Sequence, residues 1–127
     1  MPSASPPSAG ATYLNKTERI DQLRAAARRA AQRLPDIRRI ILFGSFASGI
    51  PTARSDADLL VVVETSPHRL SRDRIPGLLQ ALQPLPCPVD LFIYTAQELQ
   101  QLREEGAPVV RIALETGKDL LEPWVRP

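Results

Sequence analysis

Three short runs of β-favouring residues constrain the fold of this chain more than any other feature. They are Ile40–Phe43, Ala57–Glu64 and Pro88–Tyr94, and turn-forming residues or prolines separate them from their neighbours. Helical patterns precede, separate and follow these runs. The order predicts an α/β (α+β) fold, with a small mixed β-sheet and helices packed on it.

Capping and breaking residues define the predicted helices. They are one helix from Asn15 to Pro35, one within residues 68–86, one from the Thr95 and Glu98 capping box to Gly106, and one from Pro108 to Gly117. The predicted order is therefore helix, strand, strand, helix, strand, helix, helix. We expect residues 1–14 to form a flexible tail, 15–122 to form the domain and 123–127 to form a second tail.

Composition excludes several classes of protein. A single cysteine, Cys87, and a single histidine, His68, exclude an internal disulfide framework and a zinc site built from these two residue types alone. The longest apolar run, 59–63, is too short to cross a membrane, and the first fifteen residues do not resemble a signal peptide. We therefore expect a cytoplasmic protein. A net charge of +2 does not by itself indicate direct nucleic-acid binding.

Aspartates stand at the start of two of the predicted strands. Asp56 and Asp58 are two residues apart, so a strand would direct both side chains to one face. If the third strand pairs beside the second, Asp90 lies about 5 Å away laterally. Clustered carboxylates repel one another, and a hard divalent cation such as Mg²⁺ removes that cost. The pattern predicts a metal site.

A turn at Gly44 and Ser45 follows the first predicted strand. A strand that enters a Gly-Ser turn exposes backbone N–H groups and a hydroxyl, which are donors for an anion. Glycine also allows the backbone to approach a phosphate closely. Together with the carboxylates, this turn predicts a metal–triphosphate site.

The segments LFGSFASGIPTARSDADLLVVV and VDLFIY resemble the nucleotidyltransferase (DNA polymerase β-like) superfamily. The resemblance is greatest to its minimal nucleotidyltransferase (MNT) branch, whose members are often antitoxins of HEPN-domain toxins, and it covers roughly residues 16–122. It implies the nucleotidyltransferase fold and two Mg²⁺ ions held by Asp56, Asp58 and Asp90, which would be the catalytic residues. The turn at Gly44 and Ser45 would bind the phosphates of ATP.

The resemblance also implies a reaction and a partner. AMP would pass from ATP to a hydroxyl, typically of a tyrosine, on a HEPN toxin, and this AMPylation would silence the toxin within a hetero-oligomer. Many relatives carry arginines directly after Gly-Ser, where this chain has Phe46-Ala47-Ser48. Arg54 is the candidate to replace that phosphate-binding cation.

Other interpretations remain open at this point. The chain could be an inactive antitoxin that neutralises its partner by binding alone, or it could modify an antibiotic or a nucleic acid. The last interpretation is less favoured, because such enzymes usually add a domain for the acceptor. A lone Gly-Ser or Asp-x-Asp is commonly structural, and Arg24, Arg28 and Arg29 are predicted to form a solvated helix face.

Overall fold

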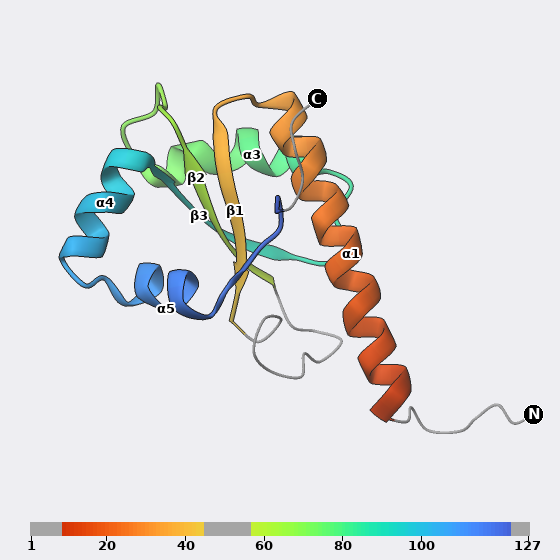
Figure 1. Ribbon diagram of the computed structural model, residues 1–127. Coiled ribbons are helices and arrows are strands. Elements are labelled where there is room, and N and C mark those ends of the chain that lie inside the picture. Colours follow the sequence, from red (N-terminus) through yellow and green to blue (C-terminus); the bar gives the residue numbers. More distant parts are fainter. Residues whose placement is uncertain (1–8, 45–56, 123–127) are drawn as a thin grey trace, which may run out of the picture.

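The computed structural model describes residues 9–44 and 57–122, with side chains from residue 16 onward. Its elements follow one another along the chain as shown in Figure 1. They are α1 (Ala9–Arg33), β1 (Ile37–Phe43), β2 (Ala57–Val63), the 3-10 helix η1 (Ser71–Arg74), α3 (Ile75–Leu82), β3 (Val89–Thr95), α4 (Ala96–Glu104), α5 (Pro108–Thr116) and β4 (Lys118–Asp119).

The four strands form one mixed sheet in the order β3-β2-β1-β4. β1 runs antiparallel to both β2 and β4, whereas β2 and β3 are parallel. A parallel pair requires a crossover connection, and η1 with α3 forms that connection here. The predicted α+β architecture is confirmed, and the second and third predicted strands are neighbours, which is the condition on which the predicted position of Asp90 depends.

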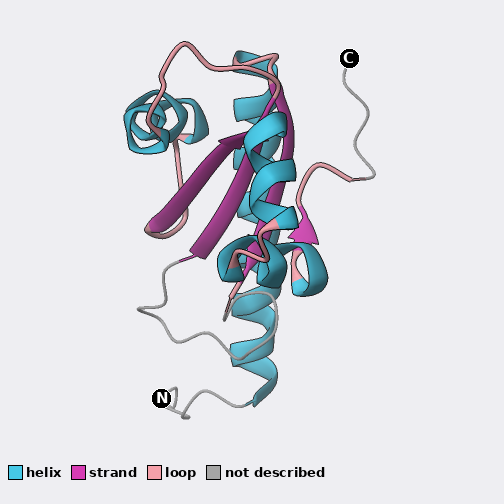
Figure 2. Ribbon diagram, turned by 90° about the vertical axis from the view of Figure 1, so that its left-hand side faces the viewer, coloured by secondary structure: helices cyan, strands magenta, loops and turns pink. Residues whose placement is uncertain are grey.

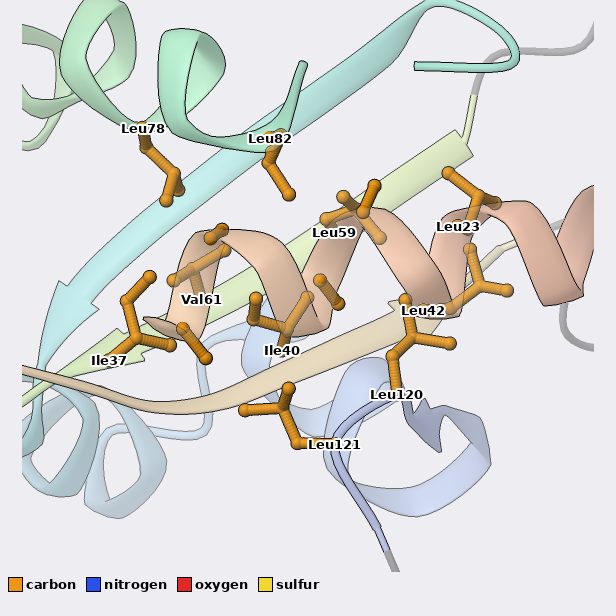
Figure 3. Packing of buried hydrophobic residues seen from close by; sticks show 14 of the residues in the cluster. Leu23, Ile37, Ile40, Leu42, Leu59, Val61, Leu78, Leu82, Leu120 and Leu121 are labelled. Atoms are coloured by element: carbon orange, nitrogen blue, oxygen red, sulfur yellow. The ribbon is translucent and has the colours of Figure 1, made fainter. Parts of the chain in front are cut away.

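Helices cover both faces of the sheet. Successive side chains of a strand point to opposite faces, so the apolar strands present a hydrophobic surface on each side. On one face, Leu59 and Val61 of β2 pack with Leu23 of α1 and Leu78 of α3 (Figure 3). On the other face, Leu60 packs in the cluster covered by α4 and α5. Figure 2 looks at the molecule from the α4–α5 side, and these two helices lie in front of part of the sheet. The core thus has two layers, one on each face of the sheet.

The helices at the C-terminal end of the domain begin where capping residues predict. The Thr95 hydroxyl accepts from the Glu98 N–H at 3.1 Å, and the Glu98 carboxylate accepts from the Thr95 N–H at 2.9 Å. Both halves of the predicted capping box are therefore present at the start of α4. α5 begins at Pro108 and ends before Gly117, as predicted.

The first helix begins earlier than the sequence suggests. α1 starts at Ala9, six residues before the predicted capping residue Asn15. No proline lies between residues 9 and 15, so nothing in the covalent structure stops the helix there, and Asn15 lies inside it. The position of the helix start is corrected, whereas the predicted boundary between tail and domain stays a prediction. Of the described helices, none is both long and apolar enough to cross a membrane.

The arginines of α1 contact backbone carbonyls, so their predicted role as a solvated face is wrong for Arg24 and Arg29. The guanidinium of Arg24 donates to the carbonyl of Glu122 at 2.8 Å, and that of Arg29 donates to the carbonyl of Pro84 at 2.6 Å. Arg33 donates to the carbonyl of Ala81 at 3.0 Å. The last carbonyls of a helix have no partner within it, and arginines of α1 bind those at the end of α3.

Candidate functional site

Two of the predicted carboxylates lie side by side at one end of the sheet. In the parallel pairing of β2 and β3, Asp58 is in register with Asp90, and neighbouring strands are about 4.8 Å apart. Leu60, Phe92 and Tyr94 belong to the cluster on the α4–α5 face. Because side chains alternate along a strand, Asp58 and Asp90 share that face. The lateral approach of these two residues that the sequence predicts is therefore confirmed.

The turn after β1 lies directly against this pair. Phe43, the last residue of β1, is in register with Asp58, and Gly44 follows with a φ of 78°. That φ lies in the left-handed region, which residues with a Cβ rarely adopt. A Cβ built on Gly44 would also overlap the Oδ2 atom of Asp58. Glycine is thus required twice, by the backbone conformation and by the approach of the Asp58 carboxylate.

An apolar floor lies beside the carboxylates on the same face. The rings of Phe43 and Phe92 meet with centroids 5.7 Å apart and planes tilted by 52°. Asp58 is half-buried, whereas Asp90 is exposed on the outermost strand β3. Asp58 therefore lies toward the apolar residues, whereas Asp90 is open to solvent. Sequence alternation alone does not reveal this pairing of aromatic rings.

Three of the predicted site residues, Ser45, Arg54 and Asp56, lie outside the described residues. Their predicted roles in phosphate and metal binding therefore stay predictions. Within the described part of the chain, no group of three or more potential metal ligands comes together. The structure thus brings together Gly44, Asp58 and Asp90 from the predicted set.

The donor set at this end of the sheet matches a hard divalent cation. Asp58 and Asp90 supply carboxylate oxygens, which are the ligands that Mg²⁺ selects. Like charges placed directly opposite on neighbouring strands destabilise a sheet, and a bound cation offsets that repulsion. Such an ion would stabilise negative charge on a phosphate. The residues present are therefore compatible with the metal that the resemblance implies.

Comparison with known proteins agrees with this geometry. Residues 23–119, more than half of the chain, match the model of the nucleotidyltransferase domain family. The chain belongs to this family. The match includes the strands that carry Asp58 and Asp90 and the turn at Gly44.

Three similar proteins share parts of this nucleotidyltransferase domain. A phosphoribosyl-dephospho-CoA transferase from Azotobacter vinelandii is 37% identical over 73 residues, which make up 55% of this chain and 33% of that protein. The chain thus spans about a third of that relative's length. A Sulfolobus solfataricus structure, provisionally assigned as a nucleotidyltransferase, superposes with a TM-score of 0.61 at 17% identity, covering 85% of this chain and 84% of that chain. A structure of a toxin-antitoxin with AMP-PNP gives a TM-score of 0.46 at 22% identity, covering 76% and 71%.

Gly44 provides a test of the site within this domain. Replacing Gly44 by alanine is expected to cost about 1–3 kcal/mol of stability, because φ is positive there, and to lower nucleotide transfer further by displacing Asp58. Gly106→Ala is the matched control, since Gly106 has a φ of 74° and a Cβ there meets nothing within 4 Å. Thermal unfolding and initial rates of transfer would be measured for both variants. Equal loss of transfer in both would show that the contact with Asp58 is unimportant.

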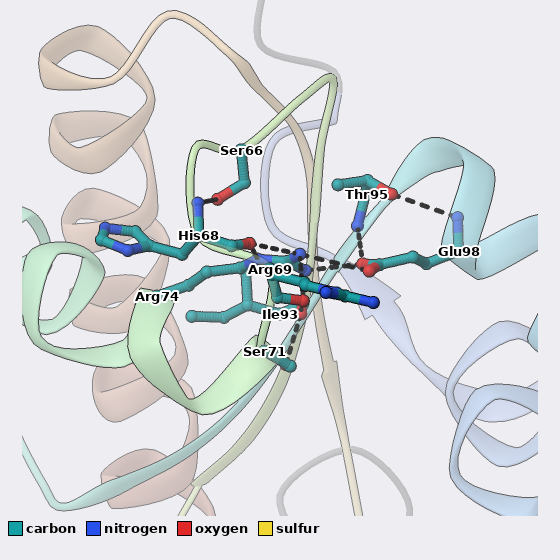
Figure 4. Close-up of polar contacts among 8 residues, drawn as sticks. All are labelled: Ser66, His68, Arg69, Ser71, Arg74, Ile93, Thr95 and Glu98. Atoms are coloured by element: carbon teal, nitrogen blue, oxygen red, sulfur yellow. Dashed lines mark hydrogen bonds and ion pairs between the residues drawn. The ribbon is translucent and has the colours of Figure 1, made fainter.

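A partly buried ion pair at the opposite end of the sheet was not predicted. The Arg74 side chain of η1 contacts the Glu98 carboxylate of α4, with Nη1 and Oε1 2.6 Å apart (Figure 4). Arg74 also donates to the carbonyls of Ile93 and His68, at 3.1 Å and 2.8 Å. The hydrogen bond from Arg74 lowers the pKa of Glu98, burial opposes this shift, and the Thr95 N–H adds to it. No local pattern pairs residues from two separate helices, so the sequence carries no signal for this contact.

Proposed function

We propose that this nucleotidyltransferase domain transfers AMP from ATP to a hydroxyl of a partner protein. The placement of Asp58 in register with Asp90, with Gly44 against Asp58, carries this proposal. It supplies carboxylates for Mg²⁺ and a turn for phosphate at one end of the sheet. The acceptor oxygen would attack the α-phosphorus of ATP, the bond from that phosphorus to pyrophosphate would break, and pyrophosphate would leave. The proton of the hydroxyl would pass to a carboxylate.

The partner in this proposal is a HEPN-domain toxin, which makes the chain an antitoxin. The resemblance of residues 16–122 to the minimal nucleotidyltransferase branch supports this choice of partner. The exposed position of Asp90 on the outermost strand is also compatible with an acceptor as large as a protein. Asp56 would complete the metal site, and Ser45 and Arg54 would contact the phosphates.

Intact-protein mass spectrometry tests this function. The purified chain would be mixed with the protein encoded beside it, ATP and Mg²⁺, and the partner would be weighed. We expect the partner to gain mass in whole AMP units, and we expect none without Mg²⁺ or with the Asp56→Ala/Asp58→Ala variant. Asp21→Ala, at an exposed position of α1, is the matched control and should retain transfer.

The binding-only antitoxin predicts a different result in the same experiment. A stable complex with no mass gain from any nucleoside triphosphate would support it, as would full neutralisation of the toxin by the Asp56→Ala/Asp58→Ala variant. Either result would overturn transfer as the necessary mechanism.

One observation favours a second donor. The match to a phosphoribosyl-dephospho-CoA transferase reaches 37% identity over 73 residues, higher than the identity to either solved structure above. The test supplies a donor in which a phosphoribosyl-dephospho-CoA unit carries pyrophosphate as its leaving group. If the partner gains the mass of that unit with release of pyrophosphate, and gains nothing with ATP, the donor is this larger nucleotide. The same carboxylates and turn would then act on a different donor.

A further inference from the structure

A groove lies at the end of the sheet opposite the carboxylates. Its volume is about 240 Å³, and its floor is apolar, with Ile37 of β1, Val63 of β2, Leu78 of α3 and Ile93 of β3 among the lining residues. Gly77 of α3 lies in its wall, and a Cβ built there meets nothing within 4 Å. The groove therefore has open space over an apolar surface.

The rim of this groove is acidic. Asp36 and Asp73 both line it, and both are exposed. Within the described part of the chain, neither carboxylate accepts a hydrogen bond or forms an ion pair. Two negative charges thus stand at the rim without a neutralising group among the described residues.

The arginine that lines the same groove does not neutralise them. Arg74 is only 8% exposed, and its guanidinium is held by the Glu98 carboxylate and by the carbonyls of His68 and Ile93 (Figure 4). These contacts occupy its N–H donors and turn its charge toward Glu98. The groove therefore combines an apolar floor with two negatively charged carboxylates at its rim.

One kind of side chain complements such a surface. Lysine and arginine place an apolar stem along a hydrophobic surface and keep a cationic head group at its edge. An acidic or neutral side chain would leave Asp36 and Asp73 without a partner on binding, which costs free energy when the rim is desolvated. The chemistry of the groove therefore favours a lysine or arginine side chain.

The groove is remote from the reacting atoms. Val63 lies five positions after Asp58 in β2, which corresponds to about 17 Å along the strand. A side chain bound here cannot receive the nucleotide, but the protein that carries it can reach the carboxylate end of the sheet.

We propose that this groove docks a lysine or arginine side chain of the acceptor protein. The proposal rests on the proposed function only in that the acceptor is a protein. Docking at one end of the sheet would hold the partner while its hydroxyl approaches Asp90 at the other end. The groove would thus contribute to recognition of the acceptor and not to the chemical step.

Filling the groove tests the proposal. Gly77→Trp places a large side chain where a Cβ has open space, so the fold should be retained, and Gly77→Ala is the matched control. With the protein encoded beside the chain as acceptor, Gly77→Trp is expected to raise KM for the acceptor about tenfold while kcat stays within about twofold. KM for ATP should not change. An unchanged KM for the acceptor in Gly77→Trp would overturn the proposal and leave the transferase function intact.

A peptide titration tests the groove independently of transfer. The probes are acetyl-Leu-Arg-Leu-amide and acetyl-Leu-Glu-Leu-amide, followed by backbone amide chemical shifts in the NMR spectrum of the full chain. The arginine peptide is expected to shift the amides of Asp36, Asp73 and Gly77, and the glutamate peptide is not. Asp36→Lys/Asp73→Lys should abolish these shifts, whereas the exposed pair Glu18→Lys/Asp21→Lys on α1 should retain them. Equal shifts with both peptides, or none with the arginine peptide, would contradict the proposal.

Discussion

Asp58→Asn is expected to lower the rate of nucleotide transfer about 10²–10³-fold while the domain stays folded. A carboxylate that holds the metal contributes several kcal/mol of charge stabilisation in the transition state, and each 1.36 kcal/mol corresponds to a factor of ten in rate. Asparagine keeps the size of the side chain and removes its charge. The change is measured as kcat/KM for ATP with saturating acceptor, and circular dichroism reports whether the fold is retained.

The stability of the metal-free protein shows whether the Asp90 carboxylate has a functional or a structural role. Asp58 and Asp90 are in register on neighbouring strands, and like charges in such pairs are destabilising. Asp90→Asn should therefore leave the metal-free protein as stable as the wild type or more stable, by up to about 1 kcal/mol. Added Mg²⁺ should raise the thermal midpoint of the wild type and not that of the variant. A clear loss of stability in metal-free Asp90→Asn would instead assign this carboxylate a structural role.

Local signals predict much of this fold. The Thr95 and Glu98 capping box and the prolines in the first turns of α3 and α5 act on neighbouring residues, so these helix starts can be predicted from the local sequence. The sequence suggests that Asp58 and Asp90 lie near each other, once β2 and β3 are assumed to be neighbours. A shift of one residue would move either carboxylate to the opposite face. Because β2 is apolar on both faces from Leu59 to Val63, its sequence alone does not exclude that shift, and the structure establishes the register.

Long-range contacts account for what the sequence does not predict. β4 consists of Lys118 and Asp119 only, which is too short to produce a periodic pattern, and it exists because it pairs with Ile41 and Leu42 of β1. Arg24 and Arg29 have the spacing of an exposed helix face, but other segments of the chain place carbonyls against them. Such partners are distant in sequence, so helical periodicity cannot identify them.

Arg74 and Glu98 form the contact whose removal should cost the most stability. Arg74→Met is expected to destabilise the domain by about 2–3 kcal/mol. Breaking a buried ion pair costs about 3–5 kcal/mol, and the 39% exposure of the Glu98 side chain reduces that value because solvent screens the carboxylate left behind. The variant also leaves the carbonyl of Ile93 without its bond from Arg74. Chemical unfolding at neutral pH measures the difference.

The pH dependence of the same variant identifies the ion pair as the cause. Because Arg74 lowers the pKa of Glu98 in the folded state, ionised Glu98 contributes stability above the usual carboxyl pKa, and this contribution is lost as the pH falls through the lowered value. In Arg74→Met the pKa of Glu98 should return toward its usual range. The stability difference between wild type and variant should therefore be largest at neutral pH and become smaller in acid.

Glu98→Gln, which removes the charge and keeps a side-chain oxygen for the Thr95 N–H, should show the same decrease in the stability difference toward acid pH. A difference that stays constant with pH would mean that Arg74 stabilises the domain through its packing and its bonds to carbonyls, and not through the charge of Glu98.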